Sequence, residues 1–123
     1  MPQSKSISVL KKRSEFLAVA ALRKKWVTPA FILQVAPRPD ATLPAKGLGL
    51  TASKKMIGNA VMRNRARRRL RALAHEMLEL HSASNTNYVF IARSDILTRA
   101  YGDLRADLEK ALKRLNMWQE VDL

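Results

Sequence analysis

Cysteine is absent from this sequence, which excludes a disulfide scaffold, a thiol nucleophile and a thiolate metal site. Long apolar runs are absent too: none approaches the roughly 18 residues of a membrane span, and residues 1–9 lack the apolar stretch of a secretory signal. Acids are scarce, with 10 Asp and Glu against 23 Lys and Arg and a formal net charge of +13. We therefore predict a soluble, cytoplasmic protein whose partner is a polyanion.

The length of 123 residues and the hydrophobic share of 47% are enough for one domain with its own core. We predict a single domain over residues 1–123, in which residues 1–9 form a flexible basic tail. Wholesale disorder does not fit this composition.

The positive charge is concentrated in one segment. Residues 54–71 hold eight Lys and Arg and no acid, and no acid occurs anywhere between Asp40 and Glu76. By contrast, residues 72–123 hold six Lys and Arg and eight acids. Protein surfaces usually intersperse both signs, and an acid-free segment of this density repels itself. An anionic partner is therefore favoured over a merely solvated basic surface.

Periodicity and turn residues predict an α+β domain. Helices are predicted over 14–22, capped by Ser14, from just after Asn59 to about Leu80, and over 98–116, capped by Thr98. Strands are predicted over 30–35, 48–53 and 88–93, with an optional short strand over 26–28, and loops over 36–46 and 82–87. The order is therefore α-β-β-α-β-α or α-β-β-β-α-β-α. Gly49, Thr51 and Ser53 share a small polar face that suits close approach by a ligand, unless Gly49 marks a bulge.

The two longer helices have apolar stripes at helical spacing, which we assign to the core. The stripe of the central helix consists of Met62, Ala66, Leu70, Leu73, Met77 and Leu80. The stripe of the final helix consists of Tyr101, Leu104, Leu108, Ala111, Leu112 and Leu115.

The solvent side of the central helix is rich in arginine. Every cation between residues 63 and 71 is Arg, whose planar fork of donors suits phosphate groups. Lys54 and Lys55 extend this patch, and Asn59 and Asn64 add neutral donors and acceptors. An anionic membrane and a calmodulin-like partner are weaker alternatives, because the apolar stripe lacks aromatic residues and is needed by the fold.

Candidate catalytic groups do not form a recognisable site. His75 and His81 are six residues apart, which turns their rings about 240° from each other on a helix, so they cannot share one metal ion. Asp103 and Asp107 lie among basic residues and are interpreted as a solvated charged face. Neither a nucleophile elbow nor a phosphate-binding P-loop is present. The residues thus predict a protein that binds nucleic acid and does not itself cut it.

One contiguous segment resembles a known family. Residues 51–71 read TASKKMIGNAVMRNRARRRLR, which is similar to the signature of bacterial ribonuclease P protein components: Ser-Lys-Lys, then Gly-Asn-Ala-Val, then an Arg-Asn-Arg helix. Weaker similarity covers residues 12–16, 31–33, 88–93 and the closing helix.

This resemblance implies an α-β-β-β-α-β-α two-layer sandwich with a left-handed β-α-β crossover, similar to the ribosomal protein S5 domain 2-like fold. It implies the protein subunit of a ribonucleoprotein, ribonuclease P, that removes the 5′ leader from precursor tRNA. The catalytic RNA would hold the Mg²⁺ ions, so no metal or cofactor is expected on the protein. The implied partners are the catalytic RNA and precursor tRNA, with neither a membrane nor DNA.

The resemblance also assigns residues to two surfaces. The catalytic RNA would be bound by Lys54, Lys55, Asn59, Arg63, Asn64, Arg65, Arg67, Arg68 and Arg71. The single-stranded leader would lie in a central cleft between the sheet and the first helix, lined by Phe16, Ile32, Gln34, Thr51, Ser53 and Arg93. Phe16 fits a plain core position equally well.

The chain departs from the family pattern at three positions. Ala20 stands where many members have a second aromatic residue, Gln34 where some have Tyr, and Ala72 where an acid often follows the arginine helix. Each missing base–aromatic contact forgoes about 1–3 kcal/mol, so this chain offers less stacking surface to a leader. Three rivals stay open: a generic RNA-binding protein such as a ribosomal protein or RNA chaperone, a DNA-binding module, and a nuclease acting through its own residues.

Overall fold

The computed structural model describes residues 7–39 and 45–121. Five strands form one sheet: β1 (Ile7–Val9), β2 (Lys25–Val27), β3 (Phe31–Pro37), β4 (Lys46–Thr51) and β5 (Thr86–Ala92). The helices are α1 (Arg13–Leu22), α2 (Lys54–Ile57), α3 (Ala60–His81), the 3-10 helix η1 (Ser94–Leu97) and α4 (Tyr101–Arg114). The α+β class and the longer form of the predicted order are confirmed, with β1, α2 and η1 as additions.

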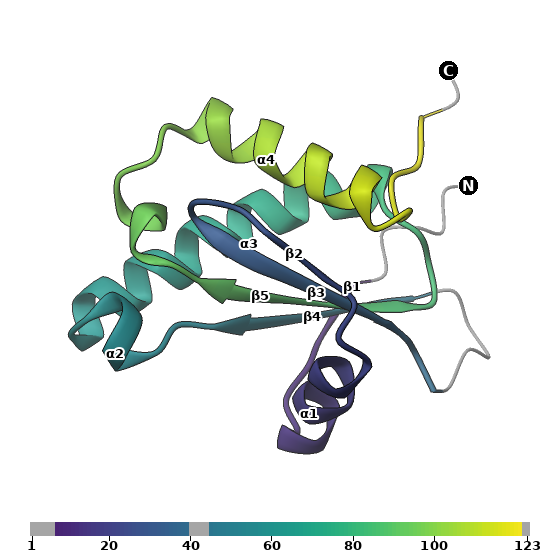
Figure 1. Cartoon of the computed structure of the whole chain (residues 1–123), viewed down its shortest axis with the longest axis horizontal. Coiled ribbons are helices and arrows are strands. Elements are labelled where there is room, and N and C mark those ends of the chain that lie inside the picture. The colour runs from purple at the N-terminus through teal and green to yellow at the C-terminus, as the bar shows by residue number, and fades with distance from the viewer. Residues whose placement is uncertain (1–6, 40–44, 122–123) are drawn as a thin grey trace.

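The strands lie in the order β1-β4-β5-β3-β2 (Figure 1). β4 pairs in parallel with both β1 and β5, whereas β3 is antiparallel to β5 and to β2. Two neighbouring parallel strands need a crossover connection, and α2 and α3 supply it between β4 and β5. This is the β-α-β unit that the resemblance implies.

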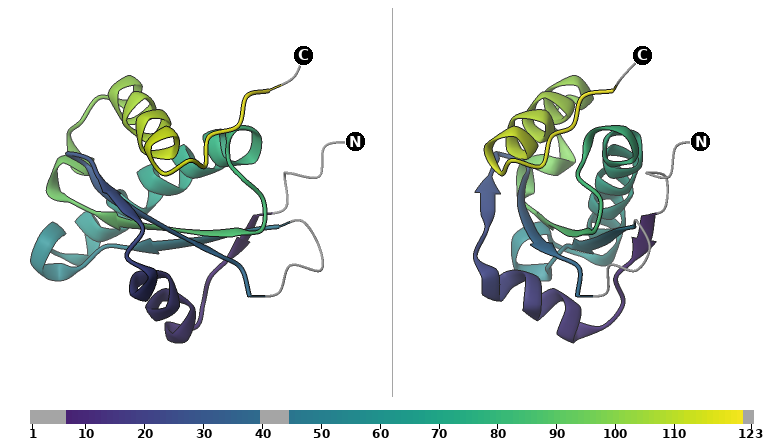
Figure 2. Two further views of the ribbon diagram at one scale, coloured as in Figure 1. Left: turned by 45° about the vertical axis from the view of Figure 1, so that its right-hand side comes forward. Right: turned by 90° about the vertical axis from the view of Figure 1, so that its right-hand side faces the viewer.

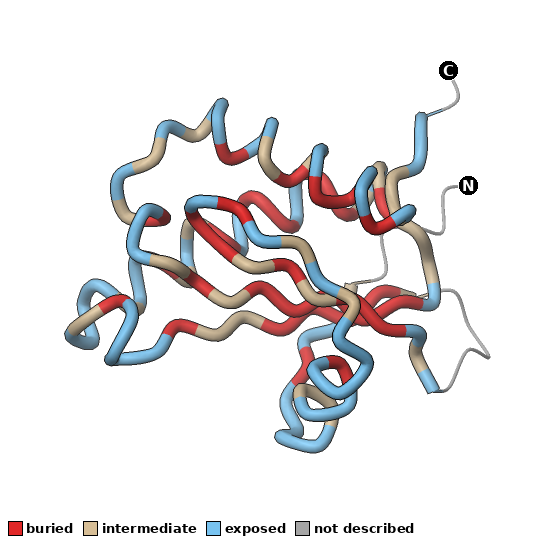
Figure 3. The backbone as a smooth tube through the Cα atoms, in the orientation of Figure 1, coloured by how far each residue is buried: buried red, intermediate tan, exposed pale blue. Residues whose placement is uncertain are grey.

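Helices cover both faces of the sheet (Figures 1 and 2). Tyr88, Phe90 and Ala92 of β5 belong to the main core beneath α3 and α4, whereas Val89 and Ile91 pack with α1. Side chains alternate between the two faces of a strand, so one strand serves both layers. The predicted two-layer sandwich is the sheet with α3 and α4, where most buried residues lie (Figure 3), and α1 adds a smaller layer on the opposite face.

The predicted flexible tail was wrong for residues 7–9, which form β1. Ile7 pairs with Lys46 and packs against the main core, and the Leu10 amide donates to the Leu48 carbonyl over 2.8 Å. β1 thereby pairs polar backbone groups of β4 that would otherwise lie at a sheet edge. The rest of the predicted tail, residues 1–6, lies outside the described residues.

The predicted caps of two helices were also wrong. α1 begins at Arg13, because a Glu15 carboxylate oxygen accepts from the Lys12 amide over 2.9 Å and from the Lys11 amide over 3.2 Å. These bonds hold the pKa of Glu15 below its usual value. Thr98 does not cap α4, since its own amide is bonded to Asp95 in the 3-10 turn and α4 starts later, at Tyr101.

Strand bounds differ from prediction by a few residues. β3 continues to Pro37 and β4 begins at Lys46, so the predicted loop over 36–46 is shorter, and its residues 40–44 lie outside the described part of the chain. β4 ends at Thr51 because Ser53 caps α2, and the predicted loop over 82–87 loses its last two residues to β5.

The predicted stripe of α3 is correct at its centre and wrong at its ends. Met62 and Leu80 are exposed, at 45% and 46%, whereas Ala74 and Leu78 are fully buried. The buried side of α3 is therefore turned toward Ala74 and Leu78, whose end of the helix is bonded to Lys46 of β4. α4 meets the other flank of α3, where Tyr101 and Arg105 bond to Glu76. The stripe predicted for α4 is buried except at Tyr101, which is half-buried.

Candidate nucleic-acid interface

The arginine-bearing end of α3 is fixed by two successive caps. The Ser53 hydroxyl accepts from the Met56 amide over 3.1 Å and starts α2, and the Asn59 side-chain oxygen accepts from the Met62 amide over 3.0 Å and starts α3. Gly58 lies between them with φ +118°, a conformation that favours glycine. This tight turn places exposed Lys54 and Lys55 beside the first turns of α3. Asn59 and Ser53 were predicted to contact RNA, and each has this capping role.

The arginine face consists of Arg63, Arg65, Arg67, Arg68 and Arg71. Two members are oriented by local bonds: Arg63 donates to the Gly58 carbonyl over 2.9 Å, and Arg67 donates to the Asn64 side-chain oxygen over 3.3 Å. Arg65, Arg68 and Arg71 are exposed and have no hydrogen-bond or ion-pair partner within residues 7–39 and 45–121. Their guanidinium groups can therefore bind an external anion without breaking a contact in the protein.

Arg69, which the predicted RNA-binding set leaves out, has a structural role. Its guanidinium donates to the Ile96 carbonyl over 2.6 Å and to the Arg99 carbonyl over 2.7 Å. These bonds tie the segment between β5 and α4 to α3. The arginines of α3 thus divide between the external anion and the fold.

The opposite end of α3 is held by a buried lysine of β4. Lys46 is 1% exposed, and its ammonium group donates to the carbonyls of Leu78 and Glu79 in the last turn of the helix. A cation here satisfies carbonyls that have no partner within the helix and complements its dipole. Burial lowers the pKa of Lys46 to about 8.

The sheet residues of the predicted leader cleft lie on the α1 face. The register places Thr51, Ile91 and Ile32 in one row across β4, β5 and β3, and Gln34 in the next row. All four side chains are half-buried, so this part of the sheet is incompletely covered.

Gly49 of β4 allows α1 to approach the sheet closely. The pairing of β4 with β5 is unbroken from Lys46 to Thr51, so Gly49 does not mark a bulge. A Cβ atom at this position would lie 2.5 Å from Cε1 of Phe16. The small face of β4 therefore accommodates the Phe16 ring.

Phe16 is both a packing residue and a wall of a surface pocket. Its ring packs against the smaller core with Val19 and Val89. It also lines a pocket of about 170 Å³ with two residues of the arginine face, Arg67 and Arg71, and with His75. His75 was missed as a site residue, although its position four residues after Arg71 on the same helix could have indicated it.

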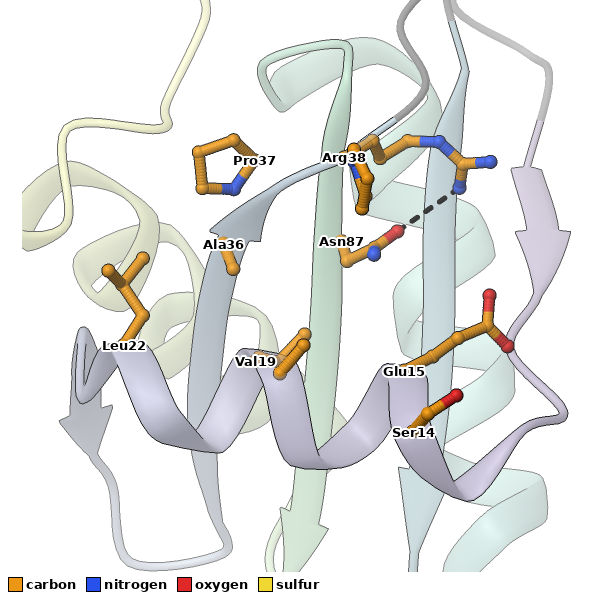
Figure 4. Close-up of a pocket in the computed structure, with 10 residues that line it drawn as sticks. Ser14, Glu15, Val19, Leu22, Ala36, Pro37, Arg38 and Asn87 are labelled. Atoms are coloured by element: carbon orange, nitrogen blue, oxygen red, sulfur yellow. Dashed lines mark hydrogen bonds between the residues drawn. The ribbon is translucent and has the colours of Figure 1, made fainter.

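The six predicted cleft residues do not share one cavity. Ser53 is exposed at the cap of α2, and Arg93 donates to the Thr28 carbonyl over 2.8 Å. A larger pocket of about 430 Å³ lies on the other side of α1 (Figure 4), and none of the six lines it. Its rim includes Arg38, which donates to the Asn87 side-chain oxygen over 3.1 Å.

The structure brings no metal-binding cluster together within its described residues. No three His, Cys, Asp or Glu side chains there are placed to hold an ion. Instead, His81 stacks on Trp118 with ring centres 4.4 Å apart, and Asp107 accepts two bonds from Arg99. No helix among these residues is long and apolar enough to cross a membrane.

The sequence matches the protein-family model described as Ribonuclease P over residues 5–116. The chain belongs to the ribonuclease P protein family. It is 49% identical over 114 residues to the ribonuclease P protein component of Paramagnetospirillum magneticum, covering 91% of this chain and 85% of that one. It is 40% identical to the corresponding component of Ruegeria pomeroyi, covering 92% and 90%. The predicted function as a ribonuclease P protein subunit, which acts with an RNA in processing the 5′ leader of tRNA, is confirmed at the level of the family.

Solved ribonuclease P proteins share the fold. The Staphylococcus aureus protein aligns with a TM-score of 0.70 at 23% identity, covering 90% of this chain and 97% of that one. The Thermotoga maritima protein aligns with a TM-score of 0.71 at 21% identity, covering 87% and 96%. These likenesses confirm the architecture, and the placement of individual contacts with RNA stays a prediction.

Proposed function

We propose that the arginine face binds backbone phosphates of the catalytic RNA of ribonuclease P, with Lys54, Lys55, Asn59 and Asn64 at its margin. The observation that carries this proposal is the set of exposed arginines without partners, Arg65, Arg68 and Arg71, on a helix that is rigidly capped at one end and held by Lys46 at the other. Guanidinium groups on a fixed helix bind phosphates bidentately with little loss of conformational freedom.

The leader of precursor tRNA would cross the partly covered sheet beside α1. There Ile32 offers an apolar contact and Thr51 a hydroxyl group. The Phe16 ring adds an aromatic edge near the arginine face. Because Gln34 and Ala20 supply no aromatic ring, the leader would be bound mainly through its backbone. Arg93 and Ser53 would contact it at the end of the sheet nearest α2.

The RNA would catalyse the reaction and the protein would only bind, and we call this the division of labour between the two. Mg²⁺ ions held by the RNA would support hydrolysis of the phosphodiester bond, and the protein would not contribute a catalytic group. Added positive charge replaces diffuse counterions around folded RNA, so the protein would lower the magnesium concentration needed for cleavage. We place the complex in the cytoplasm.

The test is reconstitution with the intact chain. Purified protein is added to ribonuclease P RNA and precursor tRNA at low magnesium, and release of the 5′ leader is followed on a gel. We expect cleavage only when RNA and protein are both present. Cleavage by the protein without the RNA would contradict the division of labour.

A generic RNA-binding protein is the second candidate, favoured only by the net charge. Competition between ribosomal RNA and ribonuclease P RNA for the protein distinguishes these two candidate functions. If ribosomal RNA displaced ribonuclease P RNA at equal concentration, the interface would be non-specific, and the proposed role would be refuted.

A further inference from the structure

A second group of cations lies on the opposite flank of the molecule from the arginine face. There the edge strand β2 packs against α4, and the right-hand view of Figure 2 shows this pair on one side and α3 with β1 on the other. Lys110 and Arg114 are exposed on α4, and Lys24 immediately precedes β2. We call these three residues, with Trp26 of β2, the β2–α4 surface.

Arg114 is held in place by an aromatic ring. Its guanidinium carbon lies 5.4 Å from the centre of the Trp26 ring, and Trp26 in turn packs against the main core. A cation–π contact orients the guanidinium plane without using its N–H donors. Lys110, one helical turn earlier, lines a small pocket with Trp26. Two cations are therefore presented side by side on a rigid support.

The acids near this surface are already engaged. Asp107 accepts from Arg99 over 2.6 and 3.1 Å, and Glu109 accepts from Lys113 over 2.7 Å. Within the described ranges, Lys24, Lys110 and Arg114 have no ion-pair or side-chain hydrogen-bond partner. The helix dipole accounts for a cation in the last turn of α4, at Arg114, but Lys110 lies before that turn. Lys24 and Lys110 therefore carry positive charge that neither an ion pair nor the helix dipole accounts for.

We propose that the β2–α4 surface binds a second segment of RNA backbone, separate from the segment bound by the arginine face. This inference rests on the proposed function, because it takes the RNA partner from it. Arg114 covers the Trp26 ring, so the ring is not available for base stacking. The contacts would therefore be made to phosphates and would be independent of base sequence. With cations on both flanks, the protein would be held between two RNA segments.

The experiment measures binding of the full chain to ribonuclease P RNA over a series of salt concentrations. The double variant Lys110→Ala and Arg114→Ala removes two unpaired cations. The matched control, Arg105→Ala and Lys113→Ala, removes two cations of the same helix that are already paired with Glu76 and Glu109. We expect the first variant to lower the slope of log K against log salt by about 1.5, and the control to leave it nearly unchanged. All four side chains are exposed, so folding should be retained.

Hydroxyl-radical footprinting of the RNA provides a second measurement. The Lys110 and Arg114 variant should lose a set of backbone protections that a variant of the arginine face keeps. Equal slope losses in the variant and its control would indicate a long-range charge effect and would overturn the inference, as would an unchanged footprint. Failure of the unaltered protein to bind the RNA would instead refute the proposed function.

Discussion

Removal of the three exposed, unpaired arginines of α3 is the most direct test of the arginine face. The variant replaces Arg65, Arg68 and Arg71 with Ala. Because none of them contacts another described residue through a hydrogen bond or ion pair, the variant should fold like the unaltered chain. Alanine is also the best helix former, so α3 should not be weakened.

The magnitude follows from counterion release. Each phosphate contact contributes about 0.9 to the salt slope on duplex nucleic acid and about 0.7 on a single strand. Loss of three contacts should therefore reduce the slope for ribonuclease P RNA by about 2 to 3. Binding of labelled RNA, followed by fluorescence anisotropy between about 0.05 and 0.2 M salt, measures this change.

The paired-cation variant of Arg105 and Lys113 is the control for net charge. Per cation removed, it should change the salt slope far less than the arginine-face variant does. A slope that stays the same after all three arginines are removed would refute the assignment of this surface to RNA, because the contacts would then have to lie elsewhere.

Three further results are expected. Arg69→Ala removes two bonds to the segment before α4 and should lower the free energy of unfolding by about 1–3 kcal/mol in urea titration; an unchanged midpoint would refute its structural role. Gly49→Ala places a methyl group against Phe16 and should cost about 1–3 kcal/mol; a stable variant that binds a leader oligonucleotide equally well would show that this close approach is dispensable. Stability should also rise with pH from about 8, because the pKa of Lys46 is lowered from 10.5 to about 8 on folding and the unfolded chain binds more protons in this window. Above pH 10 this rise in stability should be opposed, because burial raises the pKa of Tyr88 from 10.0 to about 12 and the unfolded chain then loses a proton first. Lys46→Met should abolish the rise in stability above pH 8. A rise that persists in this variant would contradict the assignment of the effect to Lys46.

The sequence predicted local structure well where a periodic pattern coincided with a single packing partner. The centre of α3 and the apolar face of α4 are examples, because helical spacing alone places Leu70, Leu73 and Leu108 on buried sides. The prediction was wrong where the position of a neighbouring element decided the outcome. α3 turns the side with Ala74 and Leu78 toward the interior and leaves Met62 and Leu80 exposed, and β1 forms only because β4 lies beside it in the folded sheet.

For the candidate site, composition and motif spacing determined the partner class and the helix that carries the charge. Those features are local, because eight cations without an acid cannot be neutralised within their own segment. Tertiary structure decided which arginines are available. Arg69 meets two carbonyls of the segment before α4, and Arg68 meets no described partner, although the two are neighbours in the chain. It also placed Arg114 over Trp26, two residues far apart in the sequence that only the packing of α4 on β2 brings together.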